Sequence, residues 1–273
     1  SKSNILSPST IREYRRMRKQ YLKTIIDKPV FKLSNQEVQA AINIEAQTHA
    51  YKTVRNIFGL LSAALKGKVD LDVALPQKEK IKITIPTQQE IQRLLQYATG
   101  KEIELPILLS ACLGLRRGEI APLDYSDIDF QRKTITISKS MVLNSSSEWV
   151  VKKPKTYSGN RTLKVYDFIL DKVQERKDAE LPLISLTPNQ ISDEFSYALE
   201  KTGLPHFRFH DLRHYNASVM LSLNIPDKYA MERMGHATNN MLKTVYQHTM
   251  QEKEDSVDAA LSEYFNALSI SKE

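Results

Sequence analysis

The chain has 273 residues, 41% of them hydrophobic and 26% charged, a composition typical of a globular protein with room for two domains. No apolar run reaches about 18 residues and no charged-then-apolar leader is present, so the sequence predicts neither a membrane span nor a secretory signal. The single cysteine, Cys112, excludes an internal disulfide framework, favours a reducing cytoplasm, and is expected to be a buried small side chain.

The first 76 residues predict a small bundle of three helices. Apolar side chains recur at helical spacing from Ile11 to Ile25, a capping box at Ser34-Asn-Gln-Glu37 begins a second helix, and a third covers about 51–65. The arginines and lysines of this block fall largely outside the apolar stripes. We therefore expect the bundle to have a basic exterior.

Charge is distributed unevenly along the chain. Residues 1–86 carry 16 Lys and Arg against 7 Asp and Glu, whereas residues 87–273 carry 23 against 25, within a total net charge of +7. A basic block attached to a near-neutral body is typical of a protein that binds a polyanion, most often nucleic acid. The same charges also fit a solvated basic helix face, and charge alone leaves both interpretations open.

A linker is predicted at 77–86, where charges alternate before a proline, and Thr87-Gln-Gln-Glu90 then caps the first helix of a second domain, 87–273. This domain is expected to be mostly helical with one small antiparallel sheet, which makes the fold class mainly α (α+β). Strands are expected near 134–142, 148–152 and 161–165. Helices are expected at about 87–98, 103–122, 166–179, 188–202, 210–223, 227–233, 239–248 and 254–268.

Four segments of the second domain carry residue types suited to phosphodiester chemistry. Breaking a phosphodiester without a metal needs a nucleophile, cations for the non-bridging oxygens, and a proton for the leaving 5′ oxygen. Arginine binds two phosphate oxygens through its planar fork, histidine and lysine transfer protons, and tyrosine forms a covalent phosphoester. The segments are Gly114-Leu115-Arg116-Arg117-Gly118-Glu119-Ile120, Lys155-Thr156-Tyr157-Ser158-Gly159-Asn160-Arg161, His210-Asp211-Leu212-Arg213, and Gly235-His236 with the later Tyr246-Gln247-His248.

The spacing of these residues predicts how some of them meet. His210 and Arg213 are three positions apart on an expected helix, so both should project from one face, where one phosphate can contact both. Arg116 lies beside an apolar cluster and needs an anionic partner, which a phosphate would supply. Lys155 is expected in the turn between two strands, from which its side chain can reach a groove.

The ordered motifs resemble those of the tyrosine recombinases, the phage integrases and related resolving enzymes. That family's pattern is an arginine in Gly-Leu-Arg-x-x-Glu, a hairpin lysine, His-x-x-Arg, a later Gly-His, and a tyrosine roughly ten residues further on. No single motif is specific, but the ordered set is, and the likeness is strongest over 110–250. It implies a catalytic set of Arg116, Lys155, His210, Arg213, His236 and Tyr246.

The resemblance also implies a reaction and partners. The expected reaction is site-specific recombination of double-stranded DNA, in which Tyr246 forms a 3′-phosphotyrosyl bond, Lys155 protonates the leaving oxygen, and a Holliday junction follows. No cofactor, metal or ATP is expected. Expected partners are recombination-site DNA, further copies of the chain in a tetramer on synapsed DNA, and accessory DNA-bending or excision factors, with no membrane. Residues 1–76 would be a core-binding domain that clamps DNA, and the helix at 254–268 would dock on a neighbouring protomer.

Two assignments within the catalytic set stay open. Lys152 and Lys153 are close enough to Lys155 in sequence to act as the hairpin lysine, and Arg117 competes with Arg116, which the Gly-Leu spacing favours. Many integrases also carry a separate N-terminal arm-binding domain. None is visible here, and because the first residue is not Met we expect a piece of a longer protein.

Histidine and aspartate groups in the second domain raise the alternative of a metal site. His210 and His214 have the spacing of two zinc ligands, but no metalloprotease glutamate or cysteine pair accompanies them, so His214 is expected to be a structural helix residue. Asp124, Asp127 and Asp129 are expected at turns and strand edges rather than around a divalent metal.

Other charged residues near the motifs are given structural interpretations. Glu119 is expected to support Arg116 as a neighbouring carboxylate. Arg117, Arg161 and Arg208 are basic enough to contact a DNA backbone, but solvated surface is the default interpretation for each.

Three other functions compete with recombination. A type IB topoisomerase would carry similar residues and relax DNA alone, but the basic bundle and the terminal helix favour strand exchange between protomers. A DNA-binding regulator without catalysis is disfavoured by the intact set of six catalytic residue types. A helical RNA-binding protein is disfavoured because no aromatic stacking motif is evident.

Overall fold

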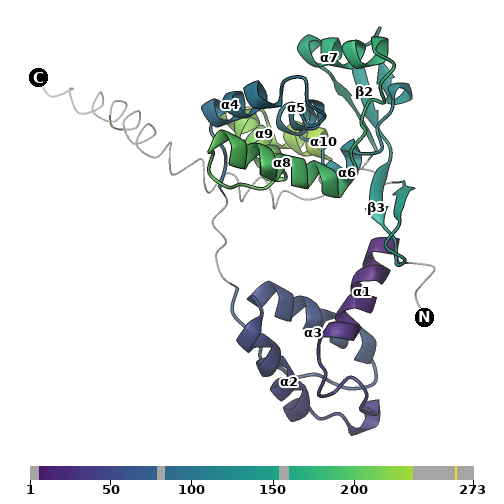
Figure 1. Ribbon diagram of the computed structural model, residues 1–273. Coiled ribbons are helices and arrows are strands. Elements are labelled where there is room, and N and C mark those ends of the chain that lie inside the picture. Colours follow the sequence, from purple (N-terminus) through teal and green to yellow (C-terminus); the bar gives the residue numbers. More distant parts are fainter. Residues whose placement is uncertain (1–5, 79–83, 154–159, 236–261, 263–273) are drawn as a thin grey trace, which may run out of the picture. The chain divides into compact units, whose positions relative to one another are not determined.

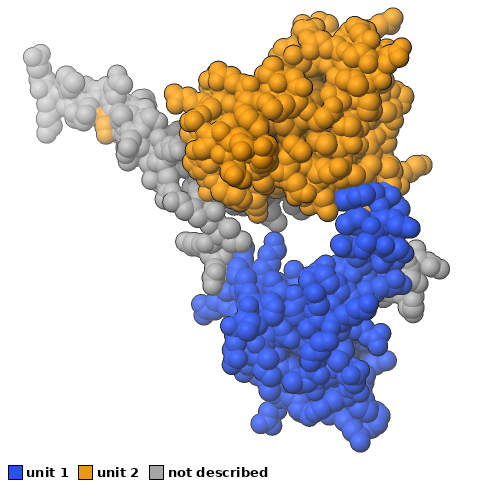
Figure 2. All heavy atoms as spheres, viewed as in Figure 1, with its two compact units in different colours: residues 1–82, 143–150 blue, residues 83–142, 151–273 orange. Residues whose placement is uncertain are grey.

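The structure, a computed structural model, describes residues 6–78, 84–153, 160–235 and 262. It divides into two compact units, one comprising Ser1–Lys82 with Leu143–Val150 and the other Ile83–Val142 with Val151–Glu273 (Figure 2). Both are built mainly from α-helices (Figure 1). The helices expected at 239–248 and 254–268 lie outside the described residues, Ser262 excepted.

Three α-helices make up most of the described part of the first unit, as the apolar spacing predicts. The predicted capping box is confirmed, because the Ser34 hydroxyl accepts a hydrogen bond from the Glu37 amide and the Glu37 carboxylate accepts one from the Ser34 amide. Buried side chains of all three helices, such as Met17, Ile42 and Ile57, form the core of this unit. The helices are α1 (Pro8–Gln20), α2 (Asn35–Thr48) and α3 (Tyr51–Leu65), with a 3-10 turn, η1 (Val30–Lys32), before α2.

The first helix is shorter than its apolar spacing predicts. α1 ends at Gln20, and Leu22 adopts a left-handed backbone with φ 57°. The buried Glu45 carboxylate accepts a 2.7 Å hydrogen bond from the Leu22 amide, which a continuing helix would have used internally. Leu22 and Ile25 are still buried, so a turn rather than a helix delivers them to the core.

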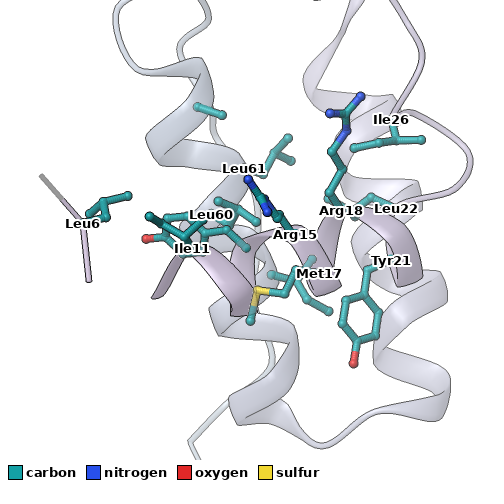
Figure 3. A pocket seen from close by; sticks show the side chains of 13 residues that line it. Leu6, Ile11, Arg15, Met17, Arg18, Tyr21, Leu22, Ile26, Leu60 and Leu61 are labelled. Atoms are coloured by element: carbon teal, nitrogen blue, oxygen red, sulfur yellow. The ribbon is translucent and has the colours of Figure 1, made fainter. Parts of the chain in front are cut away.

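A cavity of about 420 Å³ lies between α1 and α3 (Figure 3). Its walls are mainly apolar, with Leu60 and Leu61 contributed by α3. Arg15 and Arg18 of α1 also line it, so this side of the first unit combines an apolar hollow with positive charge.

The second unit is organised around α5 (Glu104–Leu113), which is buried along nearly its whole length. α5 packs against α4, α7 and α9, and α4 packs against α8. The capping box predicted at Thr87 is confirmed. Pro188 occupies the first turn of the helix expected at 188–202. None of the described helices is long and apolar enough to span a bilayer. The other helices are α4 (Gln88–Ala98), α6 (Arg117–Ile120), α7 (Asp167–Asp178), α8 (Pro188–Thr202), α9 (Asp211–Ser222) and α10 (Asp227–Met234).

Two small antiparallel sheets are found among the described residues where one was expected. The predicted strand at 134–142 is interrupted at Ser138 and Lys139, and its halves join different sheets. The Lys139 ammonium pairs with Asp124 and, at 2.9 Å, with Asp127, and these ion pairs hold the interruption in place. Asp124 and Asp127 are thus confirmed as turn residues. One sheet has the order β1 (Ile128–Asp129), β2 (Thr134–Ile137), β5 (Arg161–Lys164), and the other pairs β3 (Ser140–Leu143) with β4 (Trp149–Lys152).

Candidate active site

Arg116 is positioned by a break in the helix that the sequence predicts at 103–122. α5 ends at Leu113, because Gly114 adopts φ 69° and the amides of Gly114 and Leu115 bond back to carbonyls of the last turn. Arg116 follows with an extended backbone and caps α6. The prediction of one continuous helix is therefore wrong, and the break gives Arg116 a cap position where 35% of its side chain is exposed.

Replacing Gly114 with Ala is expected to destabilise this break. A Cβ at Gly114 would lie 3.0 Å from Asn216 Oδ1, in a backbone conformation that L-residues avoid at a cost of about 1–2 kcal/mol. Gly203→Ala is the matched control, since Gly203 also has a positive φ but has no atom within 4 Å of an added Cβ. Urea unfolding should show a larger loss for Gly114→Ala, and equal losses would contradict the close approach of Asn216.

His210 and Arg213 both lie at the start of α9. His210 caps this helix with a helical backbone, and Arg213, one turn later, has no exposed surface. Arg213 donates hydrogen bonds to the carbonyls of Gly114 and Met234. The first of these bonds holds the start of α9 against the break that precedes Arg116. The structure thus brings together three of the predicted catalytic residues.

Arg116 is held from two sides. Its Nη1 lies 2.6 Å from Glu119 Oε1, and its main-chain amide donates to Glu119 Oε2 at 3.0 Å, which confirms the expected support from Glu119. Its Nη2 donates to the carbonyl of Gly235 at 3.2 Å. Gly235 ends α10 and immediately precedes His236 in sequence. The guanidinium of Arg116 therefore contacts the residue that directly precedes His236 in sequence.

Burial and neighbouring charges set the protonation states in this cluster. Burial alone would raise the pKa of Glu119, but the hydrogen bond and charge of Arg161 and the charge of Arg116 outweigh it and lower the pKa to about 2. His210 is exposed as a whole residue, but part of its ring is desolvated, and with His214, Arg213 and Arg116 nearby its pKa falls to about 4. At neutral pH the cluster thus contains an ionised carboxylate and an uncharged histidine. Burial lowers the pKa of Arg213 to about 8, which leaves its guanidinium mostly protonated at this pH.

Comparison with known proteins identifies the family. The model of the phage integrase family matches residues 85–253. The chain belongs to this family. Similar proteins include a XerC-like tyrosine recombinase of Caldanaerobacter subterraneus, 22% identical over 221 residues, and the transposase of transposon Tn916 of Enterococcus faecalis, 22% identical over 264 residues. These alignments cover 69% and 82% of this chain but 56% and 63% of the relatives, so the chain spans about half to two thirds of their length.

Solved integrase structures share the fold of this phage integrase family member. The integrase of transposon Tn1549 in complex with transposon right end DNA has a TM-score of 0.76 at 17% identity, covering 93% of this chain and 95% of that one. A lambda integrase dimer bound to a COC′ core site has a TM-score of 0.63 at 20% identity, covering 89% and 90%. The predicted fold class, mainly helical with a minor antiparallel β component, is confirmed, although the described residues form two small sheets rather than one.

Arg161 of this integrase-family chain was expected at the solvated surface, and that expectation is wrong. Only 5% of its side chain is exposed, and its Nη2 lies 2.9 Å from Glu119 Oε2. Its Nε donates to the carbonyl of Arg233 at 2.9 Å. The signal was available in strand alternation, because Arg161 and Leu163 occupy the buried face of β5.

Two other arginines near the cluster make surface contacts. Arg117 is exposed and donates to the hydroxyl of Ser192, and Arg208, with 63% of its side chain exposed, pairs with the buried Asp211. Both line a polar cavity of about 420 Å³ that also reaches His210. Both arginines are exposed at the surface, as expected, but each is held in place by a contact with another side chain.

His214 is buried in α9, as expected of a structural residue. Its ring meets that of His210 edge to face, with the ring centres 5.2 Å apart. Among the described residues no group of three or more potential ligands is arranged for a metal ion. Cys112 in α5 is half-buried rather than fully buried as expected, and burial raises the pKa of its thiol to about 11, which makes it a weak nucleophile.

Three predicted site residues, Lys155, His236 and Tyr246, lie outside the described residues. Of the alternative hairpin lysines, Lys152 ends β4 and Lys153 follows it with an exposed side chain. The assignment of the hairpin lysine stays a prediction.

Proposed function

We propose that this chain is a site-specific DNA recombinase of the integrase type, which integrates or excises a mobile element by cleaving and rejoining DNA strands. The observation that carries the proposal is the cluster of Arg116, His210 and Arg213 beside Gly235, in a member of the phage integrase family. Two arginines and an uncharged histidine converge there. Such preorganised charge is what a phosphodiester needs as its oxygens gain charge during attack.

The proposed reaction begins with Tyr246. Its phenolic oxygen attacks the scissile phosphorus, the bond to the 5′ oxygen breaks, and a 3′-phosphotyrosyl bond forms. Lys155 gives a proton to the departing 5′ oxygen. Arg116 and Arg213 stabilise the non-bridging oxygens. The freed 5′ hydroxyl of the partner duplex then reverses these steps and produces a Holliday junction. Every role belongs to a side chain, so no cofactor, metal or ATP is proposed.

His210 and His236 are proposed to hydrogen-bond the phosphate. With a pKa of about 4, His210 is uncharged before DNA binds and its free ring nitrogen can accept a hydrogen bond from the tyrosine hydroxyl. A bound phosphate brings negative charge that offsets Arg116 and Arg213. The pKa of His210 then rises, and the ring becomes a better acceptor for the proton that Tyr246 releases.

Double-stranded DNA is the proposed substrate. Residues 1–76 are proposed as a core-binding domain that clamps DNA, joined by a linker at 77–86 to a catalytic domain, 87–273. The excess of lysine and arginine in residues 1–86 supports the clamp. Arg117 and Arg208, which line the polar cavity beside His210, are placed to contact neighbouring backbone phosphates.

Strand exchange is proposed to occur in a tetramer on two synapsed sites. A lambda integrase tetramer bound to a Holliday junction has a TM-score of 0.62 to this chain at 18% identity, which supports an assembly of this kind. The helix predicted at 254–268 would link neighbouring protomers. We also propose that accessory DNA-bending or excision factors take part and that the protein acts in the bacterial cytoplasm.

Covalent trapping tests the proposed function. The chain is incubated with candidate element-end DNA carrying a nick next to the cleavage position, so that the 5′ product diffuses away and religation stops. We expect an adduct in the presence of EDTA and without ATP, with the modified peptide containing Tyr246. Failure to trap any adduct on DNA that the chain binds, or an adduct on another residue, would contradict it. Strand exchange between two sites distinguishes recombination from topoisomerase action.

A further inference from the structure

Three arginine side chains hold three successive carbonyls at the end of α10. Arg161 Nε donates to the carbonyl of Arg233 at 2.9 Å, Arg213 Nη2 donates to that of Met234, and Arg116 Nη2 donates to that of Gly235 at 3.2 Å. The three arginines come from β5, α9 and the cap of α6. Elements far apart in sequence thus converge on one helix terminus.

These three contacts matter for the candidate site because the carbonyls lie at the end of α10. The last carbonyls of a helix lack partners within it and carry partial negative charge, so cations bind them favourably. The next residue after Gly235 is His236. Arginines that fix the end of α10 therefore fix Gly235, the residue that directly precedes His236 in sequence.

Arg161 differs from the other two in what else it contacts. Its Nη2 and Nη1 lie 2.9 and 3.4 Å from the two carboxylate oxygens of Glu119, the carboxylate that holds Arg116. Only 5% of its side chain is exposed, against 35% for Arg116. Arg161 thus has little surface to offer a phosphate, but it touches both supports of Arg116, which are Glu119 and the end of α10.

We propose that Arg161 is a positioning residue for strand cleavage, which orients Arg116 and the end of α10 by bridging Glu119 and the Arg233 carbonyl. This rests on the proposed function. A guanidinium suits the task because its rigid fork can bind a carboxylate with one edge while Nε reaches a carbonyl. Stability alone is a weak reason for such a pair, since apolar side chains of similar volume often replace buried ion pairs without loss.

The experiment compares Arg161→Met with Arg176→Met. Arg176 is the matched control because it also binds a glutamate and a carbonyl: its Nη2 lies 2.9 Å from Glu102 Oε2 and its Nε donates to Pro182 O at 3.1 Å. It lies in the same unit, and its side chain is 15% exposed. Three quantities are measured: the single-turnover rate of adduct formation on nicked DNA, the DNA dissociation constant, and the Tm.

Arg161→Met should slow adduct formation by about 10- to 100-fold, as loss of groups that orient a reacting centre typically does. Its DNA affinity should stay within about threefold of wild type, because Arg161 is not expected to neutralise a phosphate. Arg176→Met should lower the Tm and leave the adduct rate unchanged. Equal adduct rates in the two variants, at a temperature where both are folded, would overturn the inference.

Arg161→Lys separates positioning from charge and remains informative if the Met variant does not fold. Lysine keeps a cation opposite Glu119, but its single ammonium cannot span the carboxylate and the Arg233 carbonyl, so the adduct rate should be only partly restored. Full restoration would show that charge alone suffices and overturn the bridging role.

The pH dependence of the adduct rate adds a readout that a purely structural role would not change. In the Met variant Glu119 loses the neighbour that does most to keep it ionised, so the fall of the rate with acid should begin at a higher pH than in wild type. An unshifted profile would overturn the inference. If wild type itself forms no adduct, the proposed function fails instead, and the two failures are distinguishable.

Discussion

Tyr246→Phe is expected to abolish the covalent DNA adduct while leaving DNA binding nearly intact. Phenylalanine keeps the ring but lacks the oxygen that would attack phosphorus, so no phosphotyrosyl bond can form. The affinity for DNA should change by no more than about fivefold, because one neutral hydrogen bond contributes roughly 1 kcal/mol. Gel-shift titration and covalent trapping on the same nicked DNA measure the two properties separately.

A second tyrosine provides the control for this variant. Tyr229 lies on α10 in the same unit, and 63% of its surface is exposed. Tyr229→Phe removes an equivalent hydroxyl and should form the adduct at the wild-type rate. An adduct in Tyr246→Phe, or its loss in Tyr229→Phe, would show that the nucleophile had been assigned to the wrong tyrosine.

Features set by local chemistry could be predicted from the sequence. The helix starts predicted at Ser34 and Thr87 depend on a hydroxyl and a partner three residues later, and both capping boxes are present. The end of α1 could not be predicted in this way. The amide of Leu22 is taken by Glu45 of another helix, so the apolar spacing continues although the helix does not.

The candidate site shows the same division between local and distant causes. The order of the motifs identified Arg116, His210 and Arg213, because residue types in a pattern can be read from the sequence. The structure brings these three residues together. Their partners are not visible, since Arg213 bonds to Gly114 and Met234 across long stretches of chain. Gly114 signalled a break through its residue type, yet the strong apolar run around it favoured a continuous helix.

Glu119→Gln is expected to cause the largest loss of stability among variants of the described site. Glu119 is 7% exposed and is the carboxylate partner of both Arg116 and Arg161. Glutamine keeps the shape but leaves the buried Arg161 cation without its counter-charge, which typically costs about 3–5 kcal/mol. At about 2–4 °C per kcal/mol, the Tm measured by calorimetry at pH 7 should fall by roughly 6–20 °C. Glu102→Gln is the control, because the Glu102 side chain is 45% exposed and its pair with Arg176 should contribute less than about 1 kcal/mol.

The pH dependence of this difference follows from the pKa of Glu119, which is about 2 in the folded chain against an ordinary value of 4.5. A lowered pKa stabilises the folded state fully above pH 4.5, and the contribution is lost as the pH falls from there toward 2. At about 1.4 kcal/mol per pKa unit, roughly 3 kcal/mol of the free energy of unfolding depends on this carboxylate being ionised. Glutamine does not titrate, so wild type and Glu119→Gln should converge in stability on acidification through this window. A stability difference that stays constant down to pH 2 would mean that Glu119 does not act through its charge, and that the arginines of the site are held by shape alone.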